Sequence, residues 1–193
     1  MPSEGETKKL EEKANQSHLG QKDEDAASQW QQAGTQREEL GDDAARAAAR
    51  WDNPPAPQQP KPEVARSRRC DAARHWAQAA DDYLEAALLC ERLAERAADP
   101  IRRAMKTAEA VALRQKAKDA ATKALQWLEG CLDAKFESGD FSEEVSHGYV
   151  RLAIYLDLID KEDDALKAFD KSLLVEKFRK KAAEEAKKAL ENK

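Results

Sequence analysis

Histidine is the residue type in this chain best suited to binding a metal or moving a proton near neutral pH. The three histidines, His18, His75 and His147, stand far apart in the sequence. None has a second His or Cys at the spacing that would place two metal ligands on one face of a helix. We therefore expect no metal ligand and no cofactor.

Carboxylates are abundant, but their setting does not favour acid–base catalysis. Pairs such as Asp81-Asp82 and Asp163-Asp164 lie in polar stretches of helical character, where water should keep both groups ionised. The sequence also lacks GxGxxG, P-loop and GxSxG motifs. Because no nucleophile, base and orienting group occur together, we predict no catalytic residue and a protein that is not an enzyme.

The composition predicts an all-α fold. Of the 193 residues, 41% are hydrophobic and 37% are charged, and Ala, Leu, Glu, Lys and Arg, which favour helices, are frequent. Val and Ile are sparse, and no stretch alternates apolar and polar residues for long, so no strand is predicted.

Charge and hydropathy limit the partners of the chain. The formal net charge of -5 argues against nucleic-acid binding, which needs a concentrated basic surface. The N-terminus lacks the apolar core of a signal peptide, and no run of about 18 apolar residues spans a bilayer. We therefore expect a cytoplasmic protein with no membrane or nucleic-acid partner.

The distribution of polar, alanine and proline residues divides the chain into four regions. Residues 1–23 are polar and are predicted to be an N-terminal tail that is disordered or weakly helical. Residues 24–51 are predicted to form a short alanine-rich helical hairpin that turns at Gly41-Asp42-Asp43. Residues 52–62 contain five prolines and are predicted to be an extended linker. The remaining region, 63–193, is predicted to be the main helical domain.

Long helical patterns fill the first half of this domain. Apolar residues from Trp76 to Ala97 recur at alternating spacings of four and three, which predicts a helix core face. Asp99-Pro100 supplies an N-cap and a first-turn proline for the next helix, whose expected core face carries Ile101 and Met105. That helix either runs unbroken to about residue 135 or breaks near Ala117.

The region 142–177 reads as two amphipathic helices folded back on each other across a turn at Ile159-Asp160-Lys161. The first helix has an apolar face at spacings of four, three and four. The second begins with three carboxylates, which oppose the positive end of its dipole. The expected buried faces are Val145, Tyr149, Leu152 and Leu156 in the first helix, and Ala165, Leu166, Phe169 and Leu173 in the second.

This pair resembles a tetratricopeptide repeat (TPR). The resemblance covers about 36 residues and has two departures, Asp160 in place of the usual turn glycine and Lys177 in place of the closing proline. It implies antiparallel helix pairs stacked as a TPR-like α-solenoid or helical bundle, ended by a polar C-terminal capping helix within 176–193. The matching positions are Tyr149, Leu152-Ala153, Leu156, Ala165, Phe169 and Ser172.

The resemblance also implies a function. TPR proteins are interaction scaffolds, so we expect an adaptor, assembly factor or chaperone that binds a peptide or helix of a partner protein. Because the groove positions include no Lys, Asn or Arg to hold a C-terminal carboxylate, an apolar ligand segment fits better. Carried over from the family, these partner-binding positions are His147, Val150, Ile154, Asp157 and Leu158.

A structural role is the alternative. The helices predicted over 63–98 and 100–137 would then form an antiparallel coiled-coil hairpin that self-associates into a homo-oligomer. Helix length separates the two hypotheses. Helices of about 13 to 17 residues are typical of repeats, whereas unbroken helices of more than about 30 indicate a hairpin.

Overall fold

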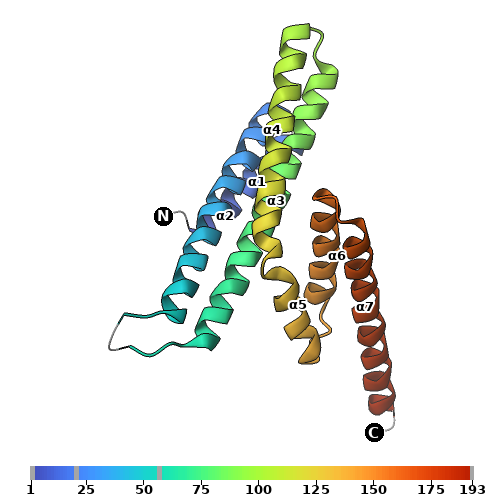
Figure 1. The fold of residues 1–193 in the computed structure, drawn as a ribbon. Helices are drawn as coiled ribbons and strands as arrows, with labels where there is room; N and C mark the ends of the chain where they lie inside the picture. The colour runs from blue at the N-terminus through green and yellow to red at the C-terminus, as the bar shows by residue number, and fades with distance from the viewer. Residues whose placement is uncertain (1–2, 20–21, 56–57, 192–193) are drawn as a thin grey trace. The chain divides into compact units, whose positions relative to one another are not determined.

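The computed structural model describes residues 3–19, 22–55 and 58–191, with side chains omitted at 16–19 and 185–191. These residues form helices and no strand, which confirms the all-α prediction (Figure 1). The chain divides into two compact units, an N-terminal unit, Met1–Ala124, and a C-terminal unit, Leu125–Lys193. The helices are α1 (Glu4–Leu19), α2 (Asp23–Asp52), α3 (Pro62–Arg96), α4 (Pro100–Leu125), α5 (Leu128–Glu137), α6 (Glu143–Leu158) and α7 (Glu162–Glu191).

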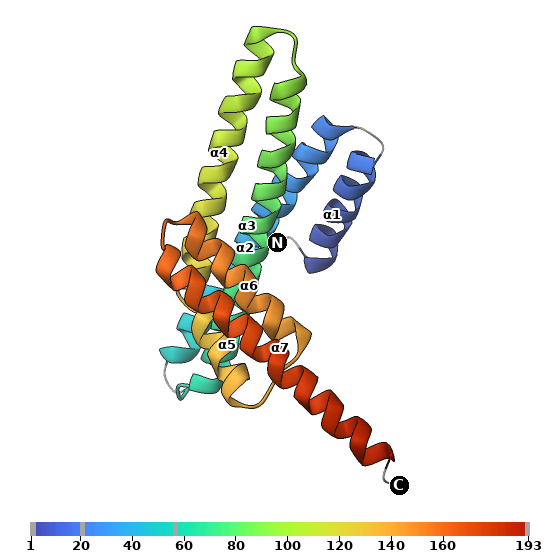
Figure 2. The same cartoon turned by 90° about the vertical axis from the view of Figure 1, so that its right-hand side faces the viewer.

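Of the two alternatives for the N-terminal tail, disordered or weakly helical, the structure shows a helix, α1. A reciprocal capping box starts it: the Ser3 amide donates to Glu6 Oε2 at 2.8 Å, and the Glu6 amide donates to Ser3 Oγ at 3.2 Å. The helix then packs on α2, where the buried Thr7 hydroxyl lies 3.3 Å from Gln36 Oε1 (Figure 2). Because residues 1–23 are polar overall, neither the capping box nor the packing of α1 on α2 was predicted from the sequence.

The expected hairpin over 24–51 is also wrong, because α2 runs through Gly41 without a turn. Gly41 allows a close contact with α3. A Cβ atom at Gly41 would lie 2.4 Å from Trp76 Cδ1, and one at Gly34 would lie 2.9 Å from Tyr83 Cδ1. These two pairs show that α2 and α3 pack antiparallel, with glycines of α2 against aromatic rings of α3.

The proline-rich segment ends and begins helices as predicted, yet it does not separate two domains. It connects α2 to α3 inside the N-terminal unit. The Lys61 amide donates to the Trp51 carbonyl at 3.0 Å, and Lys61 Nζ lies 5.1 Å from the centre of the Trp51 ring. Pro62 then occupies the first turn of α3, where no amide donor is needed.

Long helices build the rest of the N-terminal unit. Helix α3 has 35 residues and α4 has 26, and they run antiparallel from the turn at Asp99 (Figure 2). Helix α4 does not break near Ala117, which is fully buried, and it ends at Leu125. Helix α3 has the length expected for the hairpin alternative, whereas α4 lies between that length and the roughly 13 to 17 residues of a typical repeat helix.

Two left-handed residues close the helices of the C-terminal unit. Gly139 after α5 has φ 83° and Asp160 after α6 has φ 63°. Each follows the Schellman pattern; after α6, the Lys161 amide donates to the Leu156 carbonyl at 2.9 Å. The N-cap of α6 is Ser142, whose hydroxyl accepts from the Val145 amide at 3.4 Å.

The segment predicted to form the polar capping helix is helical, but it continues α7 and does not start a new helix. Helix α7 continues unbroken for 30 residues, because Lys177 stands where a proline would have ended it. Its second half begins against the α5–α6 connection, where the Phe178 ring stacks on Phe141 with centroids 4.8 Å apart. The sequence places Phe178, Ala182, Ala186 and Leu190 on one side of this segment. Ala182 is exposed, and Ala186 and Leu190 lie outside the residues whose side chains are described.

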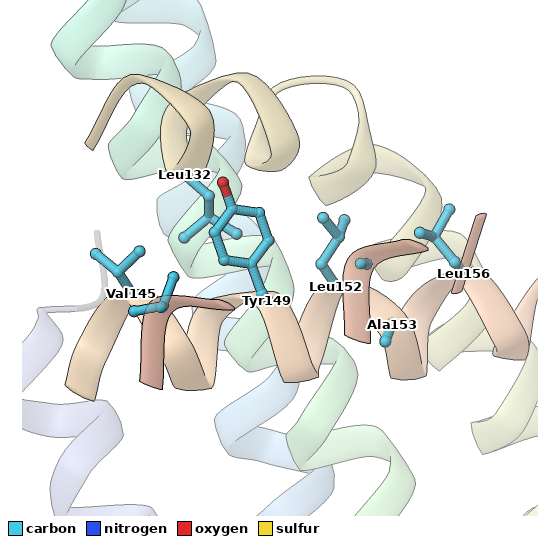
Figure 3. Close-up of a cluster of buried hydrophobic side chains, with 8 residues drawn as sticks. Leu132, Val145, Tyr149, Leu152, Ala153 and Leu156 are labelled. Atoms are coloured by element: carbon cyan, nitrogen blue, oxygen red, sulfur yellow. The ribbon is translucent and has the colours of Figure 1, made fainter. Parts of the chain in front are cut away.

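The core of the C-terminal unit lies between α5, α6 and α7. Figure 3 shows Tyr149 of α6 and Leu132 of α5 pointing toward each other. The expected face of α6 is buried, so that prediction is confirmed. The buried cluster consists of Leu132, Val145, Tyr149, Leu152, Ala153, Leu156, Ala168 and Val175.

The expected buried face of α7 is largely wrong. Leu166 is 65% exposed, Phe169 46% and Leu173 54%, whereas Ala168, Ser172 and Val175 are buried instead. The expected core face of α4 fails in the same way, with Ile101 and Met105 exposed. Apolar periodicity identifies a stripe on a helix, but not whether this chain covers it.

Candidate partner-binding site

The predicted partner-binding residues lie on one side of α6. His147, Ile154 and Asp157 are exposed, while Val150 and Leu158 are partly buried. Spacings of three and four bring them to the face opposite the buried Tyr149 and Leu152. This α6 face has an apolar centre, with Ile154 50% exposed, and polar ends at His147 and Asp157.

His147 forms a polar contact at the start of this face. Its Nε2 atom lies 3.8 Å from Glu143 Oε1, one turn earlier on α6, and both side chains are well exposed. Within the described ranges, no three side chains of the His, Cys, Asp or Glu type converge on a point that would hold a metal ion. The exposed side chains of His147 and Glu143 can offer hydrogen bonds and charge to a partner.

A polar layer fixes α6 against α5 and α7. The Tyr149 hydroxyl donates to Asp133 Oδ1 at 2.6 Å, and Lys171 Nζ donates to Asp133 Oδ1 at 2.8 Å and to Glu129 Oε1 at 3.3 Å. Lys171 Nζ also lies 5.5 Å from the centre of the Tyr149 ring. Burial, followed by the hydrogen bond to Asp133, raises the pKa of Tyr149 above its ordinary value, so the phenol stays protonated.

Close packing covers α6 on the side of α5. A Cβ atom at Gly148 would lie 2.5 Å from Leu132 Cδ2, so only glycine fits this position without a shift of Leu132. The buried Ser146 hydroxyl donates to the Ser172 carbonyl of α7 at 3.4 Å, which fixes the antiparallel register of α6 and α7. The α6 face is thereby held rigidly by its two neighbours.

Helix α7 carries a second apolar surface, which sequence reasoning assigned to the core. We call Leu166, Phe169 and Leu173 the α7 stripe. These side chains follow spacings of three and four and so share one side of the helix. Exposed apolar groups in a contiguous row are typical of protein interfaces.

Polar side chains in the N-terminal unit form hydrogen bonds between its helices. The Trp76 Nε1 donates to Asp42 Oδ1 at 2.9 Å, and Lys123 Nζ of α4 donates to Glu38 Oε1 at 2.7 Å. The Tyr83 hydroxyl lies 3.2 Å from Glu38 Oε2, and burial raises the pKa of Tyr83 to about 12. These groups link α2, α3 and α4 to one another.

Comparison with known proteins gives this chain no family. No protein-family model matches it, and searches among curated proteins and solved structures return no significant similarity. Among the residues that the structure describes, no helix is both long enough and apolar enough to cross a membrane.

Proposed function

We propose that this chain is a non-enzymatic interaction scaffold, an adaptor, assembly factor or chaperone, whose α6 face binds a peptide or helix of a partner protein. The observation that carries the proposal is the half-exposed Ile154 in the middle of α6. Its neighbours Tyr149 and Leu152 are buried within the unit, so Ile154 gains further burial only from outside the packing of its own helix.

The chemistry of the α6 face favours an amphipathic partner segment. Val150, Ile154 and Leu158 form an apolar row, and full burial of one such side chain stabilises a complex by about 1.5–3 kcal/mol. His147 and Asp157 flank the row with polar groups that select orientation. The row has spacings of four and runs along α6, so it can contact the apolar face of an amphipathic partner helix that lies alongside.

The fold adds a structural role to this proposal. Helix α3 has 35 residues, the length that the hairpin alternative anticipated, and α2 and α4 have 30 and 26. We propose that the N-terminal unit is a long-helix bundle that spaces or anchors the C-terminal unit, and that the pair α6–α7 serves as a single TPR-like binding element. Chemical crosslinking of the intact chain in solution will test whether the N-terminal unit also joins copies together.

A pull-down with the full chain tests the α6 face. We expect the double variant Val150→Asp, Ile154→Asp to lose a partner that the wild type retains, because both carboxylates would be buried in the complex. The matched control is Val111→Asp on α4, an exposed apolar position in the N-terminal unit. Circular dichroism must show unchanged helicity in both variants.

Retention of the same partner by the folded double variant would contradict the proposal. If the control Val111→Asp also lost the partner, the interaction would depend on general surface hydrophobicity. That result would also contradict the proposal that the α6 face binds the partner specifically.

A further inference from the structure

We infer that the α7 stripe is an interface with a second copy of this chain, in which two α7 helices pack antiparallel about a two-fold axis. The inference goes beyond the proposed function, because it concerns a different helix and a different partner. It rests on the apolar pattern, on the exposure of that pattern and on the distribution of charge along α7.

The stripe is the centre of a longer heptad pattern. Glu162, Leu166, Phe169, Leu173, Glu176 and Lys180 follow one another at alternating spacings of four and three. This is the seam that a two-stranded coiled coil presents to its partner helix. The three central positions are apolar and exposed, while the outer positions are charged.

Charge along α7 is asymmetric and complementary to itself when reversed. Exposed carboxylates Glu162 and Asp163 lie at the N-terminal end, and exposed ammonium groups Lys177 and Lys180 lie about four turns further along. An antiparallel second copy brings opposite charges together at both ends. A parallel copy would place like charges side by side, which is unfavourable.

A two-fold axis between Phe169 and Leu173 matches most of the pattern, with the exception of Leu166, which faces Glu176 of the second copy. Phe169 then packs on Leu173 of the second copy, and the reciprocal contact forms by symmetry. In the same register Glu162 faces Lys180 of the second copy, and Asp163 lies near its Lys177. The seam from Glu162 to Lys180 is about 27 Å long at 1.5 Å per residue.

The surface of α7 has room for this contact. An open hollow runs along its C-terminal half, lined by Leu173, Lys177 and Lys180 among others. In the antiparallel register this hollow receives Phe169 and Leu166 of the second copy. Two charges oppose the arrangement: Asp170 lies beside the axis and faces its own counterpart, and Glu176 lies opposite Leu166 of the second copy.

Sedimentation velocity of the full chain over a range of concentrations tests the inference by charge exchange. We expect Glu162→Lys alone and Lys180→Glu alone each to weaken the dimer at least about tenfold, because each places like charges opposite one another. The double variant Glu162→Lys, Lys180→Glu should regain the wild-type dissociation constant. An equimolar mixture of the two single variants should form heterodimers, since both of its pairs are complementary.

Two further variants complete the design. Glu144→Lys, an equally large charge change at an exposed site on α6, should leave the dimer unchanged. Asp170→Asn should tighten it, because it removes the repulsion at the axis. Circular dichroism should show unchanged helicity in every variant.

Three outcomes would overturn the inference: a wild type that stays monomeric at all concentrations, a dimer insensitive to the single reversals, or a double variant that stays as weak as the single ones. The proposed function is tested separately, because loss of a partner through the α6 face requires no dimer.

Discussion

Glycine and aromatic residues set the spacing of the N-terminal unit at the scale of single residues. Gly34 and Gly41 lie seven residues apart on α2, as do Tyr83 and Trp76 on α3. Lysines of α4 complete the layers, with Lys116 Nζ 5.5 Å from the centre of the Tyr83 ring and Lys123 Nζ 5.9 Å from that of Trp76. Each layer contains a glycine of α2, an aromatic ring of α3 and a lysine of α4, so the two layers hold these three helices together.

Gly41→Ala should destabilise the N-terminal unit. The added methyl group would lie 2.4 Å from Trp76 Cδ1, and overpacking of this kind lowers the free energy of unfolding by about 1–3 kcal/mol. Urea denaturation followed by Trp fluorescence measures the change. Gly130→Ala in α5 is the control, because its added methyl group would meet no packed neighbour within 4 Å, so better helix propensity should stabilise by up to about 1 kcal/mol. Equal stability of wild type and Gly41→Ala would contradict the close contact.

Arg37 is the most consequential buried charge. Its side chain is 3% exposed, forms an ion pair with Glu11, lies 3.5 Å from Asp82 Oδ2 and donates to Gln78 Oε1 at 2.5 Å. Arg37→Met should lower the free energy of unfolding by about 3–5 kcal/mol, because it leaves two carboxylates without their buried cation.

A triple variant tests this origin of the Arg37 effect. Adding Glu11→Met and Asp82→Leu to Arg37→Met removes the uncompensated carboxylates and should restore most of the stability. Chemical denaturation of all three proteins gives the comparison. A single variant as stable as the wild type would show that the Arg37 ion pairs contribute nothing to folding.

His75 should make stability depend on pH. Burial, with a smaller contribution from Arg74, lowers the pKa of His75 below its ordinary value of 6.5. The unfolded chain therefore binds a proton more readily than the folded one. This contribution is fully present above pH 6.5 and is lost as the pH falls toward the folded pKa.

The measurement is the urea midpoint at pH 7.5 and at about pH 5.5, a range chosen to span the ordinary histidine pKa. The wild type should lose more stability across this range than His75→Gln, which cannot take up the proton. Parallel losses in both proteins would assign the pH dependence to other groups.

At the scale of elements, Asp160 controls the turn between α6 and α7. It adopts φ 63°, a left-handed conformation that costs most residues about 1–2 kcal/mol and glycine almost nothing. Asp160→Gly should therefore raise the melting temperature of the C-terminal unit, and Asp160→Val should lower it. Thermal denaturation of the full chain, followed by circular dichroism, measures both. A lower melting temperature for Asp160→Gly would contradict this account of the turn.

Helix ends were predictable from sequence where capping chemistry is local. Proline and aspartate signals located the starts of α3 and α4, and the acidic triplet located the start of α7. Gly41 led to the wrong prediction of a turn within α2. Glycine occurs both in turns and at close helix contacts, and only the three-dimensional structure distinguishes the two. The predicted face of α6 is buried, whereas that of α7 is exposed, because coverage depends on packing between distant segments.

The candidate site was predictable only in part. Helical spacing places His147, Val150, Ile154, Asp157 and Leu158 on one face, and their exposure or partial burial follows from the opposite position of Tyr149 and Leu152. Their role as a binding surface came from a resemblance to TPR proteins and stays a prediction. The α7 stripe was missed because its pattern is identical to that of a buried face.

At the scale of the whole molecule, the proposed function assigns binding to the C-terminal unit and a structural role to the N-terminal unit. Polar side chains link the long helices of the N-terminal unit in layers, although α4 also exposes Ile101, Met105 and Val111. The C-terminal unit exposes apolar rows on α6 and α7. We therefore expect substitutions inside the N-terminal unit to change stability first, and substitutions on the α6 face to change partner binding with little change in stability.

Site-specific photocrosslinking tests the central claim most directly. A benzophenone amino acid placed at Ile154 in the full chain should capture one discrete partner protein, while the same group at Val111 on α4 should not. Capture at position 154, competed by unlabelled wild type but not by the Val150→Asp, Ile154→Asp variant, is the result we predict. Capture of a second copy alone, or of no protein, at position 154 would contradict the assignment of the α6 face to a partner.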